Sequence, residues 1–352
     1  MATDDPAGGQ PATLSEDADG DRVTCTACAH RCTLDPGQTG ICSVRTNHDG
    51  TLYLDTYGLV HDSPVGPPGT PDPIEKKPLY HVAPGSRILS FGGASCNFAC
   101  KFCQNHHIAH ADPEEVSLRS VSPEEAVQAA REQDCEAVAW TYNEPTIYAE
   151  YVRDTARLAQ EAGLLTAIVS NGYFTEEFVA AVGPYLDAAN VDIKGMDEHD
   201  HRAYVGAQAA PSREGAERLA AAGVHVELTY LTIPDVNDSA DELRAFVEWV
   251  RDAMGPSTPV HFSRFHGAHE MSDHPSTPVE TLDRAAAIAR EAGLEYVYVG
   301  NVPGHPASDT RCPDCDRPWI ERDGFAATLA VERGADQCAC GRPIDVTWRS
   351  RA

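Results

Sequence analysis

Seven short apolar runs alternate with amphipathic stretches over most of this 352-residue chain, and this alternation constrains the fold more than any other feature. Short apolar runs separated by helical patterns are typical of strands that alternate with helices. Helices are expected to begin near residues 122, 145, 175, 212, 239 and 277. The pattern predicts α/β units around a parallel sheet, in either a doubly wound sheet or a barrel. The expected strands span 87–91, 136–141, 164–170, 189–193, 224–230, 260–265 and 296–299.

The cysteines divide the rest of the chain into modules. Eleven of the twelve fall into three tight groups, and only Cys135, expected to be a small buried side chain, lies outside them. In a reducing compartment such groups indicate metal or cofactor sites before disulfides. The predicted organisation is a disordered acidic tail (1–22), a four-cysteine module (23–60), a proline-rich connector (61–84), the α/β barrel (85–305) and a C-terminal zinc-ribbon-like module (306–352).

The charge of the chain excludes some partners. Its formal net charge is −27, so duplex nucleic acid is not expected to bind through a basic surface. The acidic residues are spread along the chain, as on the solvated surface of a halophile's protein. With no apolar run long enough for a membrane span and no secretory signal at the start, a cytoplasmic location is expected.

The central cysteine group lies on the loop directly after the first strand. Its spacing is Cys96-x3-Cys100-x2-Cys103, with Phe102 before the last cysteine. Four cysteines would saturate a four-iron cluster, whereas three leave one iron open to a substrate or cofactor. A zinc knuckle completed by His106 or His107 is the alternative. The position at the carboxyl end of a strand favours the catalytic interpretation.

Three segments together resemble radical S-adenosylmethionine (radical SAM) enzymes. They are residues 72–81 (DPIEKKPLYH), the cysteine loop with Gln104 and Asn105, and residues 141–146 (TYNEPT). The chain is identified as a member of the AmmeMemoRadiSam system radical SAM family, which is related to pyruvate formate-lyase activating enzymes. The resemblance covers about residues 25–348. It implies a partial (β/α)6-type barrel with a 4Fe-4S cluster whose open iron chelates S-adenosylmethionine, which is cleaved to a 5′-deoxyadenosyl radical.

Other candidate residues follow the later strands. Asn143 and Glu144 stand where the related activating enzymes carry a Gly-Gly-Glu segment at the methionyl ammonium, or they form a helix N-cap. Ser170 and Asn171 match a Thr-Asn-Gly segment near the cofactor, and the resemblance also implies that Phe102 lies at the cofactor. Asp192 and Lys194 lie on one face of the fourth strand, either at the cofactor carboxylate or as a surface ion pair. The substrate side is expected to include Ser263, Arg264, His266 and Asn301.

The flanking modules each supply four thiols. Saturated coordination favours structural or electron-relay roles over catalytic ones, and disulfides are the weaker alternative. The N-terminal module is expected to hold zinc or an auxiliary iron-sulfur cluster, and the C-terminal module zinc. The N-terminal ligands are Cys25, Cys28, Cys32 and Cys42; the C-terminal ligands are Cys312, Cys315, Cys338 and Cys340.

Two functions from different classes fit these observations. The first is a radical enzyme of the activating type that modifies a protein, with ferredoxin or flavodoxin as electron donor. The resemblance implies a Memo-like, AMMECR-type or glycyl-radical protein as the partner, and a small molecule is the other possibility. The second is a zinc-scaffold adaptor without catalysis. Iron and sulfide content separates the two.

Overall fold

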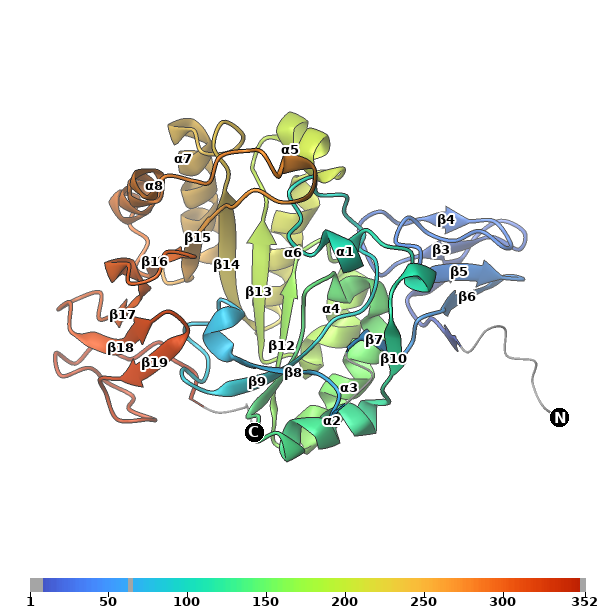
Figure 1. Cartoon of the computed structure of the whole chain (residues 1–352), viewed down its shortest axis with the longest axis horizontal. Helices are drawn as coiled ribbons and strands as arrows, with labels where there is room; N and C mark the ends of the chain where they lie inside the picture. The colour runs from blue at the N-terminus through green and yellow to red at the C-terminus, as the bar shows by residue number, and fades with distance from the viewer. Residues whose placement is uncertain (1–8, 63–65, 349–352) are drawn as a thin grey trace.

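The computed structural model describes residues 9–62 and 66–348, and an eight-stranded sheet lies at its centre (Figure 1). The strand order is β8-β9-β11-β12-β13-β14-β15-β16, with β8 antiparallel to β9 and all later neighbours parallel. Because this order never reverses, the sheet lacks the switch point of a doubly wound fold and forms the wall of a partial barrel. The strands are β8 (Thr70–Pro73), β9 (Arg87–Phe91), β11 (Ala137–Trp140), β12 (Leu165–Ser170), β13 (Ala188–Ile193), β14 (His225–Thr232), β15 (Val260–Arg264) and β16 (Val297–Gly300).

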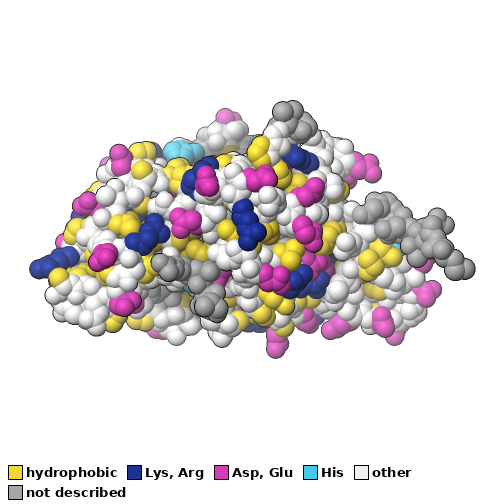
Figure 2. Space-filling model, turned by 90° about the horizontal axis from the view of Figure 1, so that it is seen from below, with side chains coloured by type: hydrophobic (Ala, Val, Ile, Leu, Met, Phe, Trp, Pro, Cys, Tyr) yellow, Lys and Arg dark blue, Asp and Glu magenta, His cyan; other side chains and the backbone are white. Residues whose placement is uncertain are grey.

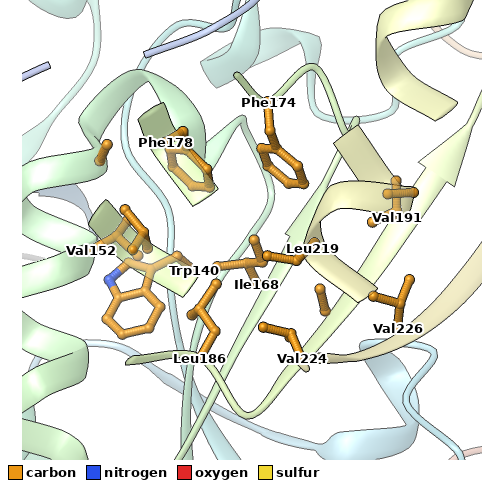
Figure 3. Close-up of a cluster of buried hydrophobic side chains, with 14 of the residues drawn as sticks. Trp140, Val152, Ile168, Phe174, Phe178, Leu186, Val191, Leu219, Val224 and Val226 are labelled. Atoms are coloured by element: carbon orange, nitrogen blue, oxygen red, sulfur yellow. The ribbon is translucent and has the colours of Figure 1, made fainter. Parts of the chain in front are cut away.

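Helices cover the outer face of this sheet. Ser122 and Glu125 form a capping box at the first of them, as its sequence predicts. Buried side chains such as Trp140, Ile168 and Leu219 pack between strands and helices (Figure 3). The short helices α1 (His106–Ala109) and α5 (Glu198–Val205) were not expected. The other α-helices are α2 (Pro123–Glu132), α3 (Ala149–Glu161), α4 (Glu176–Val182), α6 (Ala210–Ala221), α7 (Ala240–Trp249) and α8 (Val279–Glu291).

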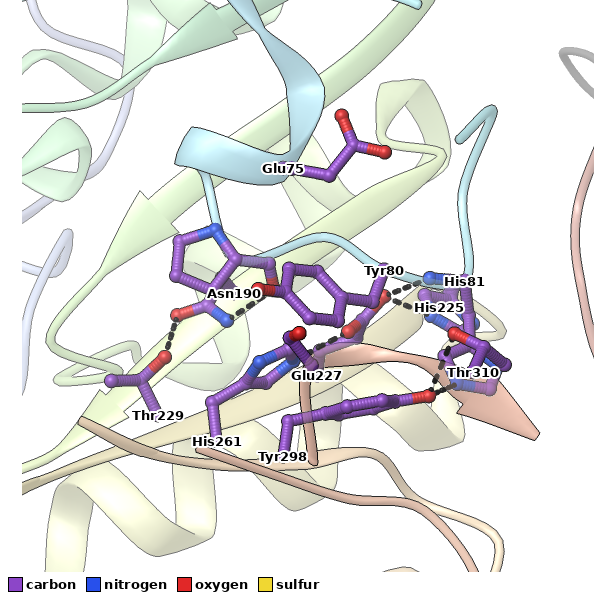
Figure 4. Close-up of polar contacts among 12 residues, drawn as sticks. Glu75, Tyr80, His81, Asn190, His225, Glu227, Thr229, His261, Tyr298 and Thr310 are labelled. Atoms are coloured by element: carbon purple, nitrogen blue, oxygen red, sulfur yellow. Dashed lines mark hydrogen bonds and ion pairs between the residues drawn. The ribbon is translucent and has the colours of Figure 1, made fainter. Parts of the chain in front are cut away.

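The inner face of the sheet is closed at one end by residues 74–83, here called the plug. Its apolar side chains, including Ile74 and Leu79, pack on small residues of β11 and β12 such as Ala137 and Ala167. Beside them Glu227 accepts hydrogen bonds from the His81 backbone N–H at 2.8 Å and lies 2.7 Å from His261 Nε2 (Figure 4). The plug fills this end of the barrel, so the open end lies at the carboxyl ends of the strands.

The N-terminal region corrects two expectations. Residues 1–22 were predicted to be a disordered tail, but strands form within 10–17, where Ala12 and Leu14 are buried and anchored. The acidic composition of this segment gave no indication that these two side chains are buried. Residues 1–8 lie outside the described part.

The proline-rich connector was expected to lie outside the core, yet β8 extends the sheet, because an edge strand tolerates proline. The strands here are β1 (Gln10–Pro11), β2 (Ser15–Asp17), β3 (Val23–Cys25), β4 (Thr33–Leu34), β5 (Arg45–His48), β6 (Thr51–Leu54), β7 (Leu59–His61) and its partner β10 (Leu118–Ser120).

The C-terminal module is a small antiparallel sheet of β17 (Thr310–Arg311), β18 (Pro318–Asp323) and β19 (Ala326–Leu329). Trp319 is fully buried in a cluster shared with Tyr80 of the plug and Tyr296 beside β16. Seen from below, Asp and Glu side chains are dispersed over the face in Figure 2, with Lys and Arg between them. No helix among the described residues is long and apolar enough to cross a membrane.

Candidate functional site

A cavity of about 260 Å³ lies at the carboxyl ends of the parallel strands. Its lining comes from the loop after β9 and from the ends of β11, β12, β13, β14 and β15. Ser263 and Asn301 line it as well, whereas Arg264 and His266 do not. Side chains from segments more than two hundred residues apart, such as Cys96 and Asn301, are therefore brought together here. The lining includes all ten residues proposed from the sequence for catalysis and cofactor binding: Cys96, Cys100, Phe102, Cys103, Asn143, Glu144, Ser170, Asn171, Asp192 and Lys194.

The central cysteine loop is fixed by its backbone. Ser95 adopts a left-handed conformation (φ 67°), and its N–H donates to the Ile108 carbonyl at 2.8 Å. Further along, the Ala99 N–H donates to Val205 at the end of α5 at 2.9 Å. Phe98 and Phe102 are buried beside the thiols. The unexpected helices α1 and α5 thus hold the two ends of the loop.

The three thiols of this loop require a metal to become good ligands at neutral pH. Burial raises the pKa of all three, to about 12 for Cys100, where the charge of Lys194 opposes the rise. Metal binding displaces thiol protons and offsets this cost. His106, the candidate fourth ligand of a zinc knuckle, lies with its Nδ1 3.1 Å from the Cys103 carbonyl oxygen.

Glu144 is a buried carboxylate that organises two strand ends. It caps the short helix η3 (Pro145–Tyr148) and accepts from the Thr146 N–H at 2.9 Å and from the Thr146 hydroxyl. It also accepts from the Ser170 hydroxyl at 2.7 Å and the Asn171 N–H at 2.8 Å. Burial raises its pKa, although these hydrogen bonds oppose the rise. Glu144 is therefore the N-cap of η3, as one interpretation of the sequence predicted, and the same side chain also lines the cavity.

Asn143 connects the end of β11 to the cysteine loop. Its Oδ1 accepts from the Gly93 N–H at 2.9 Å, and its Nδ2 donates to the Ser95 carbonyl at 2.9 Å. The side chain is 9% exposed. Its amide is therefore used to position the loop.

Tyr142, which the sequence analysis gave no role, takes the conformation of a glycine. Its φ is 74°, at a position where the related activating enzymes were expected to carry glycine. Its hydroxyl donates to Asp72 at 2.7 Å, and Asp72 lies 2.6 Å from the Lys77 ammonium. Lys77 is buried and lies 4.6 Å from the centre of the Tyr142 ring. The contacts of Tyr142 with Asp72 and Lys77 connect the 72–81 segment to the site. The sequence motif at 72–81 was noticed, but no chemical role was assigned to it.

Asp192 and Lys194 form an ion pair inside the cavity. The Lys194 ammonium lies 2.6 Å from Asp192 Oδ2 and 5.8 Å from the centre of the Phe102 ring. Burial lowers the pKa of Lys194, but the charges of Asp192 and Cys100 raise it overall. Among the described residues, Asp192 Oδ1 is buried with no hydrogen-bond partner. That oxygen is available to a donor on a bound ligand.

Asn97 was missed by the sequence analysis. Asn171 Nδ2 donates to Asn97 Oδ1 at 2.8 Å, so the cysteine loop is joined to the end of β12. Within the described part of the chain, the other amide atom, Asn97 Nδ2, is buried without an acceptor. A polar residue next to Cys96 was the only available signal, and it is too common to identify a contact.

The flanking thiols adopt two different arrangements. Among described residues, one group of His, Cys, Asp and Glu has all its ligand atoms within 4.8 Å of one another, and it is the C-terminal set of four cysteines. In it, Cys312 and Cys340 sulfurs are 3.5 Å apart and those of Cys315 and Cys338 are 3.7 Å apart. The N-terminal thiols instead surround one small cavity. All twelve cysteines are free of disulfides.

Comparison with known proteins adds family information. The Radical SAM superfamily model matches residues 92–250. The uncharacterized protein MJ0808 of Methanocaldococcus jannaschii is 39% identical over 95% of this chain and 98% of its own length. Pyruvate formate-lyase 1-activating enzyme of Escherichia coli K12 is 26% identical over 61% of this chain and 93% of its own. A crystallised domain of a pyruvate-formate lyase-activating enzyme from Bacteroides vulgatus aligns with a TM-score of 0.42 at 18% identity, over 47% of this chain and 99% of that domain.

Proposed function

Because this chain belongs to the radical SAM superfamily, we propose that Cys96, Cys100 and Cys103 hold a 4Fe-4S cluster at which S-adenosylmethionine is cleaved by one-electron reduction. The observation that supports this most is the convergence of three thiols, one buried and two half-buried, with the polar ends of β11, β12 and β13 on one cavity. Superfamily membership makes the protein a radical SAM enzyme, so the zinc-scaffold alternative without catalysis is set aside.

The cavity offers suitable groups for both parts of this cofactor system. Three thiol ligands leave one iron of the cluster for the amino and carboxylate groups of S-adenosylmethionine, whose cleavage supplies a 5′-deoxyadenosyl radical. Asp192 Oδ1, buried and without a partner among the described residues, can accept from a bound ammonium or hydroxyl. Lys194 provides a positive charge for a carboxylate. Glu144, Ser170 and Asn171 hold the strand ends that face these groups.

The first test removes the cluster ligands one at a time. Each of Cys96→Ala, Cys100→Ala and Cys103→Ala is expected to abolish reductive cleavage of S-adenosylmethionine, measured as 5′-deoxyadenosine formed under anaerobic conditions. Cys135→Ala, which alters a buried cysteine outside the three groups, is the matched control. Retained cleavage in any of the three variants would contradict the assignment.

The second test addresses the ion pair in the cavity. Lys194→Met is expected to weaken binding of S-adenosylmethionine by about 10- to 100-fold, the range of one charge-assisted contact. Its iron content should equal that of the unaltered protein. Unchanged binding would leave Asp192 and Lys194 as an ion pair without a role in binding the cofactor.

For the reaction partner we propose a protein. The E. coli relative is named as an activating enzyme of pyruvate formate-lyase, and a second relative, from Thauera aromatica, as an activating enzyme of benzylsuccinate synthase. A glycyl-radical protein and Memo-like or AMMECR-type proteins are the candidates, with ferredoxin or flavodoxin as electron donor. Transfer of hydrogen from a deuterated candidate into 5′-deoxyadenosine tests each one. Deuterium transfer from no protein, but from a small molecule, would overturn this proposal.

The C-terminal cysteines are proposed to bind one zinc ion. Four sulfurs at about 2.3 Å from a tetrahedral ion lie about 3.8 Å apart, close to the 3.5 and 3.7 Å separations of the two pairs. The shortened Cys338-x-Cys340 spacing is compatible with this arrangement. Zinc analysis of the purified chain, with Cys340→Ala as the variant, tests the site. No loss of zinc from this variant would contradict it.

A further inference from the structure

The N-terminal thiols gather around one cavity beside the barrel. Cys25, Cys28, Cys32 and Cys42 all line it, together with Arg45. Cys25, Cys28 and Cys42 are buried, and Cys32 is half-buried. Four thiols that line one small cavity, with no disulfide among them, form a ligand set for a metal site.

The spacing of these thiols differs from that of a single-ion site. The C-terminal four sulfurs lie within 4.8 Å of one another, and the N-terminal four do not form such a group. The central thiols, which the proposed function assigns to a cluster, do not form one either. A cluster spreads its ligands because each sulfur binds a different iron, whereas zinc draws all four sulfurs to one point. In this respect the N-terminal group is like the central one.

The N-terminal module also touches the central cysteine loop directly. The His30 ring nitrogen Nε2 lies 2.8 Å from the Asn97 carbonyl oxygen. Cys28 belongs to the same buried apolar cluster as Phe98 and Cys100. The Oδ1 atom of Asn97 lies 3.7 Å from the Cys96 sulfur.

Asn97 therefore connects the N-terminal module, through His30, with Cys96 of the central loop. The residue is 3% exposed, and its Nδ2 has no acceptor among the described residues. A buried amide donor without an acceptor, in the residue next to Cys96, can donate to a sulfur ligand, and such a contact stabilises a reduced, more negative cluster. Ile41, which also lines the cavity, is 60% exposed, so the site lies close to the surface.

We propose that Cys25, Cys28, Cys32 and Cys42 hold an iron-sulfur cluster, not zinc, and that this cluster passes electrons to the one at Cys96, Cys100 and Cys103. The relay rests on the proposed function of the central site. A reduced one-electron protein of the ferredoxin or flavodoxin class gives one electron to the N-terminal cluster. That electron moves on to the oxidised central cluster, and the N-terminal cluster returns to its oxidised state. No bond is formed or broken and no proton moves.

The first experiment separates the cluster from the relay. In the full chain, Cys96→Ala, Cys100→Ala and Cys103→Ala are combined, so that only the flanking modules can bind metal. After anaerobic reconstitution with iron and sulfide, we expect at least about two irons and as many sulfides per chain, and visible absorption that bleaches with dithionite. Adding Cys32→Ser and Cys42→Ser should remove all of the iron. Zinc without sulfide in the triple variant would overturn the proposal, whatever the activity of the unaltered enzyme.

The second experiment tests the relay. The double variant Cys32→Ser/Cys42→Ser keeps the central ligands, and Cys135→Ser is its control. We expect reduction of the central cluster by reduced flavodoxin to slow about tenfold or more, a barrier increase of over one kcal/mol, while dithionite still reduces it fully. The cluster of the triple variant should itself accept an electron from flavodoxin. Reduction of the double variant at the control's rate, or no reduction of the triple variant, would overturn the relay.

Discussion

The two flanking cysteine modules have the same number of thiols but differ in what surrounds them. The N-terminal thiols lie between small sheets and the barrel wall, in contact with the central loop. The C-terminal thiols lie in a separate lobe next to the plug and the far strand β16 (Figure 1). The comparison teaches that ligand count alone does not define a metal site. Sulfur spacing and the neighbouring elements distinguish a site that can exchange electrons with the catalytic centre from one that stabilises a lobe.

The largest expected difference between the modules appears when the C-terminal thiols are removed. Cys338→Ala should release zinc and unfold the small lobe, since such a lobe has too few apolar residues to fold without its metal, which contributes several kcal/mol or more. Hydrogen exchange of residues 310–347 should rise strongly, whereas cleavage of S-adenosylmethionine should survive in part. Complete loss of cleavage would show that this lobe also supports the catalytic cavity.

The N-terminal module depends on a buried ion pair. The Arg45 guanidinium lies 2.5 Å from Glu150 in α3, and both side chains are at most 4% exposed. Glu150 also accepts from the Thr13 and Leu14 backbone N–H groups at 3.0 and 3.2 Å. Arg45→Met leaves the carboxylate buried without its counter-charge and should lower the free energy of unfolding by about 3–5 kcal/mol. Urea unfolding measures this loss.

A matched change in the C-terminal module should cost less. Arg322 donates to the Tyr80 carbonyl and the Thr310 hydroxyl, each at 2.8 Å, and lies 3.8 Å from Glu75. Its hydrogen bonds thus go to neutral groups. The Glu75 carboxylate is also buried, but it makes no direct hydrogen bond to Arg322 and keeps one from the Gly85 N–H at 2.8 Å. If Arg322→Met destabilises the chain as much as Arg45→Met, the modules are held by equivalent forces and this part of the comparison fails.

Acid should release the C-terminal module first. Burial lowers the pKa of His81 to about 4, from 6.5 in an unfolded chain. The folded state therefore binds fewer protons in this range, and stability falls as the pH drops from 6.5 to about 4, by about 3 kcal/mol in total. His81 Nδ1 lies 2.5 Å from the Asp345 carbonyl oxygen. Its Nε2 lies 2.6 Å from the Tyr298 hydroxyl (Figure 4). Charging this ring disrupts contacts that join plug, barrel and C-terminal module.

The N-terminal counterpart is His30, whose pKa burial lowers to a smaller extent. Hydrogen exchange at decreasing pH is expected to show loss of protection in residues 310–347 before residues 10–61. His81→Gln, which stays neutral, should remove the pH dependence of the C-terminal module between 6.5 and 4. Equal acid sensitivity in this variant would assign the effect to other groups.

Much of the barrel was predictable because the spacing of apolar residues along the chain indicates which side chains are buried in strands and helices. All seven expected parallel strands are present, and β9 has the expected bounds of 87–91. The cavity residues were found because polar side chains follow strands whose carboxyl ends meet at one edge. The ordered segment 10–17 was not predictable, since its anchor Glu150 is more than 130 residues away. Long-range contacts of Tyr142 and Asn97 leave no local pattern either, and β8 was hidden by its prolines.

The smallest expected effects concern exposed ion pairs that join each module to the barrel. Arg31 binds Glu177 of α4 with distances of 2.6 and 2.7 Å, and the two side chains are 44% and 33% exposed. Arg342 lies 2.6 Å from Glu295 with both side chains less than 25% exposed, and 3.6 Å from Asp345. Arg31→Met should therefore cost less than about 1 kcal/mol. Arg342→Met should cost more, because less water screens its contacts and three carboxylates, those of Glu295, Asp314 and Asp345, lose their partner.

Salt provides the measurement that separates these two pairs. At about 1 M salt the screening length falls to about 3 Å, which removes most of the attraction between exposed charges and less of that between partly buried ones. Thermal unfolding of Arg31→Met should then match that of the unaltered chain. The Arg342→Met variant should still unfold at a lower temperature, since its contacts at the base of the C-terminal module are shielded from the ions. Equal salt dependence for both variants would mean that the two modules are joined to the barrel by ion pairs of the same kind, and that their difference lies in the metal sites alone.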